Sequence, residues 1–208
     1  MLLKLYSENP ELSKILKAVE ILRNDGIVII PTDTVYALCC DIYNTKAVDK
    51  ICNIKGVKPE HANFSFICNG LSNISEFTRQ FNSSVYKLMK QLLPGPFTFI
   101  LQANNKVPPI FRSKKKTIGI RVPDNSIARE IVKELGNPVM ATSVHDEDEI
   151  VDYITDPSLI HDTFKEVDAV IDGGPGGIEP STVIDCTGSE PVIVREGKAQ
   201  IYLPEILK

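Results

Sequence analysis

Short apolar runs and helix-like segments alternate along this chain. The residues at 27–30 (IVII) form a continuous apolar run, which is typical of a central strand that is covered on both faces. Apolar residues recur at helical spacing between Leu12 and Leu22, with Pro10 expected at the first helical position, and again from Ala47 to Ile54. This alternation predicts an α/β fold with a sheet at its centre.

Further runs extend the pattern over most of the 208 residues. The last two apolar runs are too close in sequence for a helical crossover, so we expect them to pair antiparallel and the sheet to be mixed. The polar stretch 144–157 is interpreted as a mobile loop and not as a linker, which gives a single domain over residues 1–208. The expected strands are 27–30, 36–42, 64–68, 97–101, 117–122, 139–143, 167–171, 182–186 and 192–194.

The chain is mildly acidic, with a formal net charge of −4. A site for an anion or a nucleic acid must therefore come from local clustering of Lys and Arg. One such cluster joins Arg112 to the lysines at 114–116. An acidic run, DEDE, occupies 146–149, and we interpret it as a solvated loop in preference to the carboxylate pair of a hydrolase.

Cysteine and histidine usage argues against a metal site. The five cysteines contain no C-x-x-C pair, and the three histidines lack the spacing of metal ligands. We interpret the cysteines as reduced packing residues and expect no protein-bound metal. No apolar run approaches the roughly 20 residues of a membrane span, and the first residues lack the layout of a signal peptide. We therefore expect a cytoplasmic location and no membrane partner.

Glycine-rich phosphate loops are not recognisable in this sequence. The densest glycine cluster, GGPGG at 173–177, lacks the G-K-[ST] ending of a P-loop and the G-x-G-x-x-G of a dinucleotide fold. We interpret it as a turn that requires positive φ.

Short polar side chains follow the first apolar run. Thr32, Asp33 and Thr34 lie directly after it, in PTDTVYAL. Ligands of open α/β sheets bind beyond the carboxyl ends of strands, where hydroxyl and N–H groups are available. On this motif alone, a plain turn in which Asp and Thr bond their own backbone is the preferred interpretation.

Other segment ends strengthen the ligand interpretation. Arg121 lies inside the apolar strand TIGIRVP, where a guanidinium is costly unless it meets an anion or a carboxylate. Cationic and hydroxyl side chains at segment ends in an acidic protein are the composition of a pocket for a phosphorylated ligand. The candidate residues are Thr34, Lys55, Lys58, Thr117, Arg121, Ser143, His145, Ser181 and Arg195.

The motifs PTDTVYAL, IKGVKP, TIGIRVP, ATSVH and PSTVID with VREG occur in the order seen in the YrdC/YciO family, from about residue 25 to about residue 197. The sequence resembles that family, and the YciO branch more than YrdC itself. The resemblance implies a twisted mixed sheet with flanking helices and a large concave, basic cavity. It implies an enzyme that converts L-threonine, bicarbonate and ATP, with Mg²⁺, to threonylcarbamoyl-AMP and pyrophosphate for tRNA modification. Double-stranded RNA or tRNA are further implied partners.

The family's functional residues map onto this sequence motif by motif. Arg121 would pair with the carboxylate of the amino acid. By this resemblance the residues that hold the amino acid would be Thr34, Arg121, Ser143 and Ser181. Those that face ATP would be Lys55, Lys58, Thr117, His145 and Arg195, and the catalytic residues would be Lys55, Ser143 and Arg195.

Two positions depart from the YrdC pattern of K-x-R followed by S-x-N. Val57 stands where the arginine is expected, and His145 stands in place of the asparagine. A lost arginine weakens the stabilisation of charge in phosphoryl transfer, so slow catalysis or a different acid substrate is an open alternative. A second alternative is an RNA-binding module that uses the cluster at 112–116, and a third is a small-molecule regulator with the same pocket.

Overall fold

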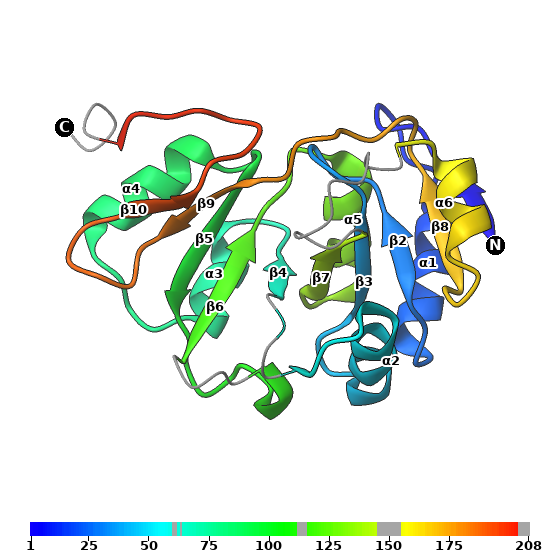
Figure 1. Cartoon of the computed structure of the whole chain (residues 1–208), viewed down its shortest axis with the longest axis horizontal. Coiled ribbons are helices and arrows are strands. Elements are labelled where there is room, and N and C mark those ends of the chain that lie inside the picture. Colours follow the sequence, from blue (N-terminus) through cyan, green and yellow to red (C-terminus); the bar gives the residue numbers. More distant parts are fainter. Residues whose placement is uncertain (60–61, 63, 112–115, 145–154, 204–208) are drawn as a thin grey trace.

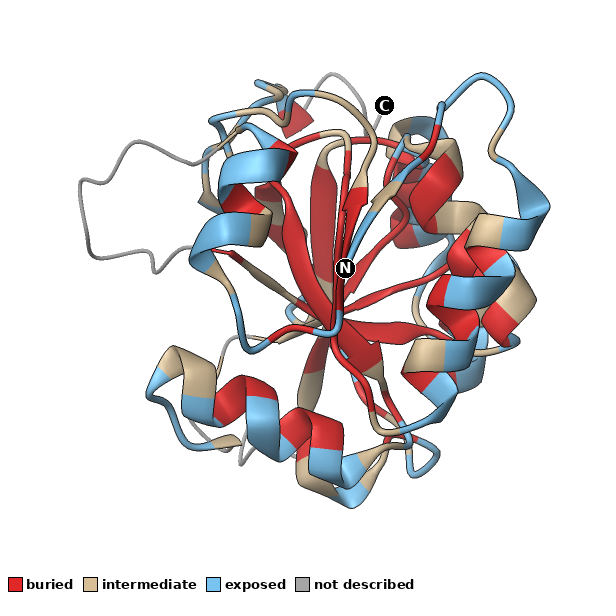
Figure 2. Ribbon diagram, turned by 90° about the vertical axis from the view of Figure 1, so that its right-hand side faces the viewer, coloured by how far each residue is buried: buried red, intermediate tan, exposed pale blue. Residues whose placement is uncertain are grey.

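The computed structural model describes residues 1–59, 62, 64–111, 116–144 and 155–203. Its strands form a single ten-stranded sheet in the order β1-β8-β2-β3-β7-β4-β6-β5-β9-β10. Parallel and antiparallel pairs both occur: β2 is parallel to β8 and antiparallel to β3. The sheet is strongly twisted, and its strands fan out between the surrounding helices (Figures 1 and 2). The predicted mixed α/β fold is therefore confirmed.

Strands and helices follow one another along the chain as the sequence pattern predicts. The strands are β1 (Leu2–Lys4), β2 (Val28–Ile30), β3 (Ala37–Asp41), β4 (Ser65–Ile67), β5 (Phe97–Gln102), β6 (Thr117–Arg121), β7 (Val139–Ser143), β8 (Ala169–Asp172), β9 (Thr182–Asp185) and β10 (Val192–Arg195). The helices are α1 (Leu12–Arg23), α2 (Thr45–Lys55), α3 (Leu71–Phe77), α4 (Ser83–Leu92), α5 (Ser126–Leu135) and α6 (Pro157–Thr163).

Two helices that border the site are fixed at both ends by their sequence. The Asn44 side chain accepts a hydrogen bond from the N–H of Ala47 and caps α2, and Asn125 caps α5 in the same way. At their C-termini, Gly56 and Gly136 adopt left-handed conformations with φ of 64° and 89°. These caps determine where α2 ends, and hence the position of Lys55 at its last residue.

The two faces of the sheet are covered unequally. Helices α1 and α5 pack together over β2, β3, β7 and β8, and their buried residues form one apolar cluster with those strands. Helices α2, α3, α4 and α6 contribute to the larger cluster on the opposite face. In that second cluster, Phe66 makes edge-on ring contacts with Phe77 and Phe111. On the α1/α5 face, the core cluster does not extend over β5, β6, β9 and β10.

Most of the predicted strands and helices are confirmed, and the departures occur in short or terminal elements. The last two strands pair antiparallel as expected. Helix α1 begins after Glu11, so the prediction of Pro10 at its first position was wrong. The strands and α-helices that the sequence pattern missed in the described residues are β1, α3 and α6, and each has seven residues or fewer. The acidic run at 146–149 and most of the stretch interpreted as a loop lie outside the described residues.

The GGPGG segment braces the loop that follows β2. Only Gly174, with φ of 91°, has the positive φ predicted for this cluster among its glycines. Gly177 instead approaches the backbone of Thr34 and donates its N–H to the Thr34 carbonyl at 2.7 Å. The hydroxyl of Tyr36 donates to the Gly174 carbonyl at 2.7 Å and accepts from the Gly173 N–H at 3.2 Å. The cluster is therefore a close-packing element as well as a turn.

All five cysteines are free and buried, in agreement with their interpretation as packing residues. Burial raises the pKa of the Cys68 thiol to about 12, so it stays protonated near neutral pH. None of the helices in the described part of the chain is long and apolar enough to cross a membrane.

We expect Gly177→Ala to destabilise the fold. A Cβ at this position would lie 2.6 Å from the Thr34 carbonyl oxygen, which is backbone and cannot rotate away. Overpacking of this kind costs about 1–3 kcal/mol, so the urea midpoint should fall at an unchanged slope. Gly188→Ala is the matched control, because its Cβ would meet its nearest atom, the Glu190 carbonyl oxygen, at 3.8 Å. Equal stability of the two variants would contradict the bracing role of the glycine.

Candidate functional site

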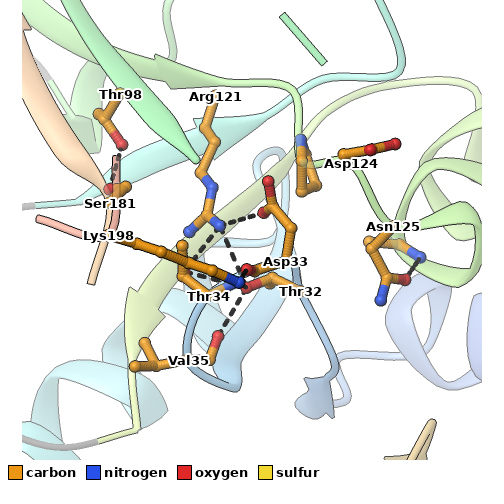
Figure 3. A network of polar contacts seen from close by, with 12 residues as sticks. Thr32, Asp33, Thr34, Val35, Thr98, Arg121, Asp124, Asn125, Ser181 and Lys198 are labelled. Atoms are coloured by element: carbon orange, nitrogen blue, oxygen red, sulfur yellow. Dashed lines mark hydrogen bonds and ion pairs between the residues drawn. The ribbon is translucent and has the colours of Figure 1, made fainter. Parts of the chain in front are cut away.

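The site is built around a buried guanidinium. Arg121 is the last residue of β6, and it is 7% exposed. Its Nη2 donates to Asp33 Oδ1 at 2.5 Å, to Thr34 Oγ1 at 2.7 Å and to Thr32 Oγ1 at 3.1 Å (Figure 3). Three acceptors on one nitrogen hold the side chain in place across the sheet. The strand arginine thus has the carboxylate partner that its burial requires, and this partner is Asp33 of the same chain.

The loop that supplies these acceptors is itself closely tied. Thr32 Oγ1 donates to the Val35 carbonyl at 2.7 Å and accepts from the Thr34 N–H at 3.0 Å. Lys198, from the segment after β10, reaches across the loop and donates to the Asp33 carbonyl at 2.6 Å (Figure 3). The interpretation of this motif as a plain turn and its interpretation as a ligand-binding edge are therefore both compatible with the geometry. Its side chains bond locally, and they also face Arg121.

A second polar group adjoins the first on the neighbouring strands. The Thr98 and Ser181 hydroxyls lie 2.7 Å apart, and Thr98 is the cross-strand partner of Arg121. Arg195 Nη2 donates to the Ser181 carbonyl at 3.0 Å and lies 3.5 Å from its hydroxyl. Two arginines therefore flank the hydroxyl pair of Thr98 and Ser181.

A β-bulge directs Arg195 towards this group. The register of β10 against β9 shifts between Ile193, opposite Ile184, and Arg195, opposite Val183. In a strand of regular register, Arg195 would face the same side as Ile193, which packs against the larger core cluster. With the bulge, Arg195 aligns with Val183, which in turn pairs with Thr98 of β5. The bulge thus brings Arg195 to the face that carries Arg121, a use for which bulges are common near functional sites.

A third group links α2 to the end of β7. Lys55 Nζ donates to the Ser143 carbonyl at 3.3 Å. Ser143 pairs with Ala37 at the start of β3, and the Val144 N–H donates to the Tyr36 carbonyl, so this group adjoins the loop of Thr32 to Thr34. The structure therefore brings Lys55, Ser143, Thr34, Arg121, Ser181 and Arg195 into one connected region.

Small residues keep part of this face open. On β6, Gly119 and Thr117 lie on the same side as Arg121, and both are partly exposed while Ile118 and Ile120 are buried. Gly119 pairs with Ser65 of β4, and a Cβ on it would already crowd Ser65 and Thr98 at 3.3–3.4 Å. An elongated ligand could therefore extend from Arg121 along β6, over a distance of about 13 Å to Thr117 at the usual strand rise.

The structure gives less information about the other predicted site residues. Thr117 lies on the correct face at the far end of β6 from Arg121. Lys58 is exposed, and its side chain forms no ion pair or hydrogen bond with the described residues. His145 lies outside the described residues, and so do Arg112, Lys114 and Lys115 of the basic cluster. The roles of all these residues remain predictions.

Two functional candidates were missed by sequence reasoning. Asp33 was noted only as a turn or ligand-edge residue, although a buried strand arginine requires a carboxylate and Asp33 carries one beside two predicted hydroxyls. Lys198 contributes a further cation next to Asp33. It directly follows the VREG motif, but nothing in the sequence signals that this segment folds back over the loop.

Burial and charge act in opposite directions on the guanidinium. Desolvation lowers the pKa of Arg121, the Asp33 carboxylate raises it, and the nearby charge of Arg195 lowers it further. An arginine pKa is high enough for the group to stay charged. The Asp33 carboxylate therefore neutralises the first of the two guanidinium groups.

Two hollows are outlined on the described surface, and neither is lined by Lys55, Arg121, Ser143 or Ser181. One, of about 660 Å³, lies among the ends of β1 and β8 and the start of α6. The other, of about 420 Å³, adjoins Thr182, Ile193 and Tyr202. The large basic cavity remains a prediction. Within the described ranges, no group of three or more His, Cys, Asp or Glu side chains could hold a metal ion.

Fold and site together define an α/β protein with a twisted mixed sheet, one half-open face, and cations and hydroxyls gathered at strand ends. The family model described as "Telomere recombination" (Sua5_yciO_yrdC) matches residues 20–197. The chain therefore belongs to the Sua5/YciO/YrdC family, as its motifs indicated.

Two relatives illustrate the range of the family. An uncharacterized protein of Haemophilus influenzae is 42% identical over 195 residues, which cover 93% of each chain. The threonylcarbamoyl-AMP synthase of Bacillus subtilis is 31% identical over 200 residues, which cover 93% of this chain but 55% of the synthase. The similarity to the synthase thus concerns about half of that longer protein.

Solved structures agree with this placement. The crystal structure of Escherichia coli YciO matches with a TM-score of 0.89 and 37% identity, and 98% of each chain is covered. Pyrococcus abyssi Sua5 complexed with L-threonine matches with a TM-score of 0.85 and 26% identity over 95% of this chain and 57% of Sua5. The relation to YciO spans both chains almost completely.

We expect Asp33→Ala to be strongly destabilising, because it leaves the Arg121 charge buried without a counter-charge. Breaking a buried ion pair from one side costs about 3–5 kcal/mol. Arg121→Met in the same background should recover part of this loss, and urea unfolding of the wild type, both single variants and the double variant would measure the coupling. Asp124→Ala, which removes an ion pair whose carboxylate is 72% exposed, should cost less than about 1 kcal/mol. Additive single effects at Asp33 and Arg121 would contradict the central role of the pair.

Proposed function

We propose that this protein binds L-threonine and ATP on the half-open face of its sheet and forms threonylcarbamoyl-AMP from them and bicarbonate. The observation that carries the proposal is the convergence of Lys55, Ser143, Arg121, Ser181 and Arg195 in one region. A second support is the shared fold with a Sua5 that is complexed with L-threonine. ATP would enter with Mg²⁺ as its metal complex, so that no resident metal site is required.

The proposed reaction joins two anions. Threonine and bicarbonate give a carbamate with loss of water. A carbamate oxygen then bonds to the α-phosphorus of ATP, the bond from that phosphorus to the bridging oxygen breaks, and pyrophosphate leaves with the electron pair. Fixed cations and N–H donors are what this step needs. Thr34, Arg121, Ser143 and Ser181 would hold the amino acid, and Lys55, Thr117 and Arg195 would face the nucleotide.

The departures at Val57 and His145 bear on rate more than on binding. The ground-state contacts proposed here come from hydroxyls, backbone groups and the remaining cations. An arginine at position 57 would act on charge that develops in the transition state. We therefore propose slow synthesis in comparison with enzymes that carry the full K-x-R pattern. Incubation with ATP, Mg²⁺, bicarbonate and L-threonine, followed by mass spectrometry for the mixed anhydride, tests the reaction. Absence of product while ATP still binds would overturn it.

Lys55→Ala should weaken ATP binding without unfolding the protein. A charge-assisted hydrogen bond contributes about 1.5–3 kcal/mol, so we expect at least about a tenfold rise in the dissociation constant by calorimetry. Lys50→Ala is the matched control, because Lys50 lies on the same helix and bonds the Asp25 carbonyl instead. Unchanged ATP affinity in Lys55→Ala would show that the nucleotide does not lie beside this lysine.

Arg195→Ala should weaken ATP binding at least about tenfold, because it removes a cation that is proposed to face the nucleotide. Val194→Ala is the matched control, since it keeps the bulge that aligns Arg195 with Val183 and should bind ATP like the wild type. If calorimetry finds that Arg195→Ala is folded and binds ATP normally, Arg195 is not a nucleotide contact.

A further inference from the structure

A buried carboxylate oxygen in the site has no partner. Asp33 Oδ1 is bonded to Arg121, but Asp33 Oδ2 is buried and accepts no hydrogen bond from any residue that the structure describes. The Asp33 side chain is 10% exposed. An unsatisfied buried acceptor costs about 1–3 kcal/mol, and more when it is charged. Such an atom in a candidate site is an acceptor that a donor on a ligand can satisfy.

Arg121, the partner of Asp33, has N–H groups that lack an acceptor in the part of the chain that the structure describes. Arg121 Nη2 has two hydrogens, and three acceptors surround it, so it has none to offer a ligand. Arg121 Nε is buried without a partner among the described residues. Figure 3 shows the contacts converging on one end of the guanidinium. The ion pair thus presents an unused acceptor on Asp33 beside unused N–H groups on Arg121.

This combination selects against a ligand that carries only a negative charge. A bare carboxylate that approached Arg121 would also meet the negative charge of Asp33, and it could not form two bonds to the guanidinium without displacing Asp33 from Nη2. A ligand with a positively polarised N–H next to its carboxylate satisfies both partners at once. The head group of an α-amino acid has this arrangement.

We propose that Asp33 is a specificity-determining residue that recognises the amino nitrogen of the bound amino acid. Asp33 Oδ2 accepts a hydrogen bond from the α-ammonium group, or from the N–H of the carbamate that forms from it. The carboxylate of the same ligand accepts one hydrogen bond from an N–H group of Arg121 that Asp33, Thr32 and Thr34 leave unused. This inference deepens the proposed function and rests on it, since it concerns the same site. The alternative is a small rotation that pairs Oδ2 with Nε and leaves the pair closed to ligands.

Calorimetry with two ligands tests the proposal. L-threonine is compared with (R)-3-hydroxybutanoate, which keeps the carbon skeleton, carboxylate and hydroxyl but lacks the amino group. The wild type should bind threonine at least tenfold more tightly. Asp33→Asn retains the size of the side chain and removes its charge. It should weaken threonine binding at least tenfold and leave the analogue unchanged or more tightly bound, because Arg121 then lacks its internal counter-charge.

Asp124→Asn is the matched control. It removes a carboxylate that lies near the site (Figure 3). This carboxylate bonds Arg129, at 3.1 Å, and not Arg121. This variant should keep the wild-type preference, whereas loss of the preference would show that overall charge is responsible. Equal weakening of both ligands by Asp33→Asn would reduce Asp33 to a structural role.

If Asp33→Asn fails to fold, the comparison of the two ligands on the wild type still tests the proposal. Equal affinity of the wild type for both ligands overturns recognition of the amino nitrogen and leaves the proposed threonine binding intact. Binding of neither ligand overturns the proposed function together with this inference.

Discussion

The buried ion pair between Arg121 and Asp33 organises this half of the molecule. A guanidinium on a sheet face needs acceptors in fixed places, and a single loop supplies three of them. That loop is in turn held by Gly177 against Thr34 and by the Tyr36 hydroxyl between Gly173 and Gly174. The glycine-rich segment, the threonine loop and the end of β6 are therefore one structural unit, although they are far apart in sequence.

Unequal coverage of the sheet then leaves room for chemistry beside this pair. Helices α1 and α5 cover the α1/α5 face over β2, β3, β7 and β8, and the polar residues begin beyond that cover. Gly119 has no side chain and Ser65 has a small one, so no bulky group covers the neighbouring surface. The bulge in β10 directs Arg195 to the same face. Fold and site are thus linked by a simple condition: cations can be kept where the apolar layer ends, because carboxylate, hydroxyl and carbonyl acceptors take the place of apolar side chains there.

Sequence patterns predicted the elements that are long or strongly marked. The run at 27–30 became β2, and the glycines at 56 and 136 end helices as left-handed caps. The three residues of β1 were missed because they are too few to show a period. The resemblance led us to expect Lys55, Arg121, Ser143, Ser181 and Arg195 in one site; the structure places them in one connected region, and their roles stay predictions. The bulge was not predictable, because no residue in Val192–Arg195 marks the shift of register.

The partner of Arg121 shows what the structure adds to the sequence motif. The sequence showed that this arginine needs an anion, and the family resemblance supplied a substrate carboxylate for that purpose. The structure supplies Asp33 first, which leaves Lys55, Arg195 and Lys198 as the cationic groups beside a neutralised pair. Binding of a zwitterionic amino acid is compatible with a neutral pair, whereas stabilising the charge of departing pyrophosphate depends on the other cations. Under the proposed function, amino-acid binding and stabilisation of the leaving group therefore depend largely on different residues, and the absence of an arginine at position 57 would slow the reaction while the amino-acid site stays intact.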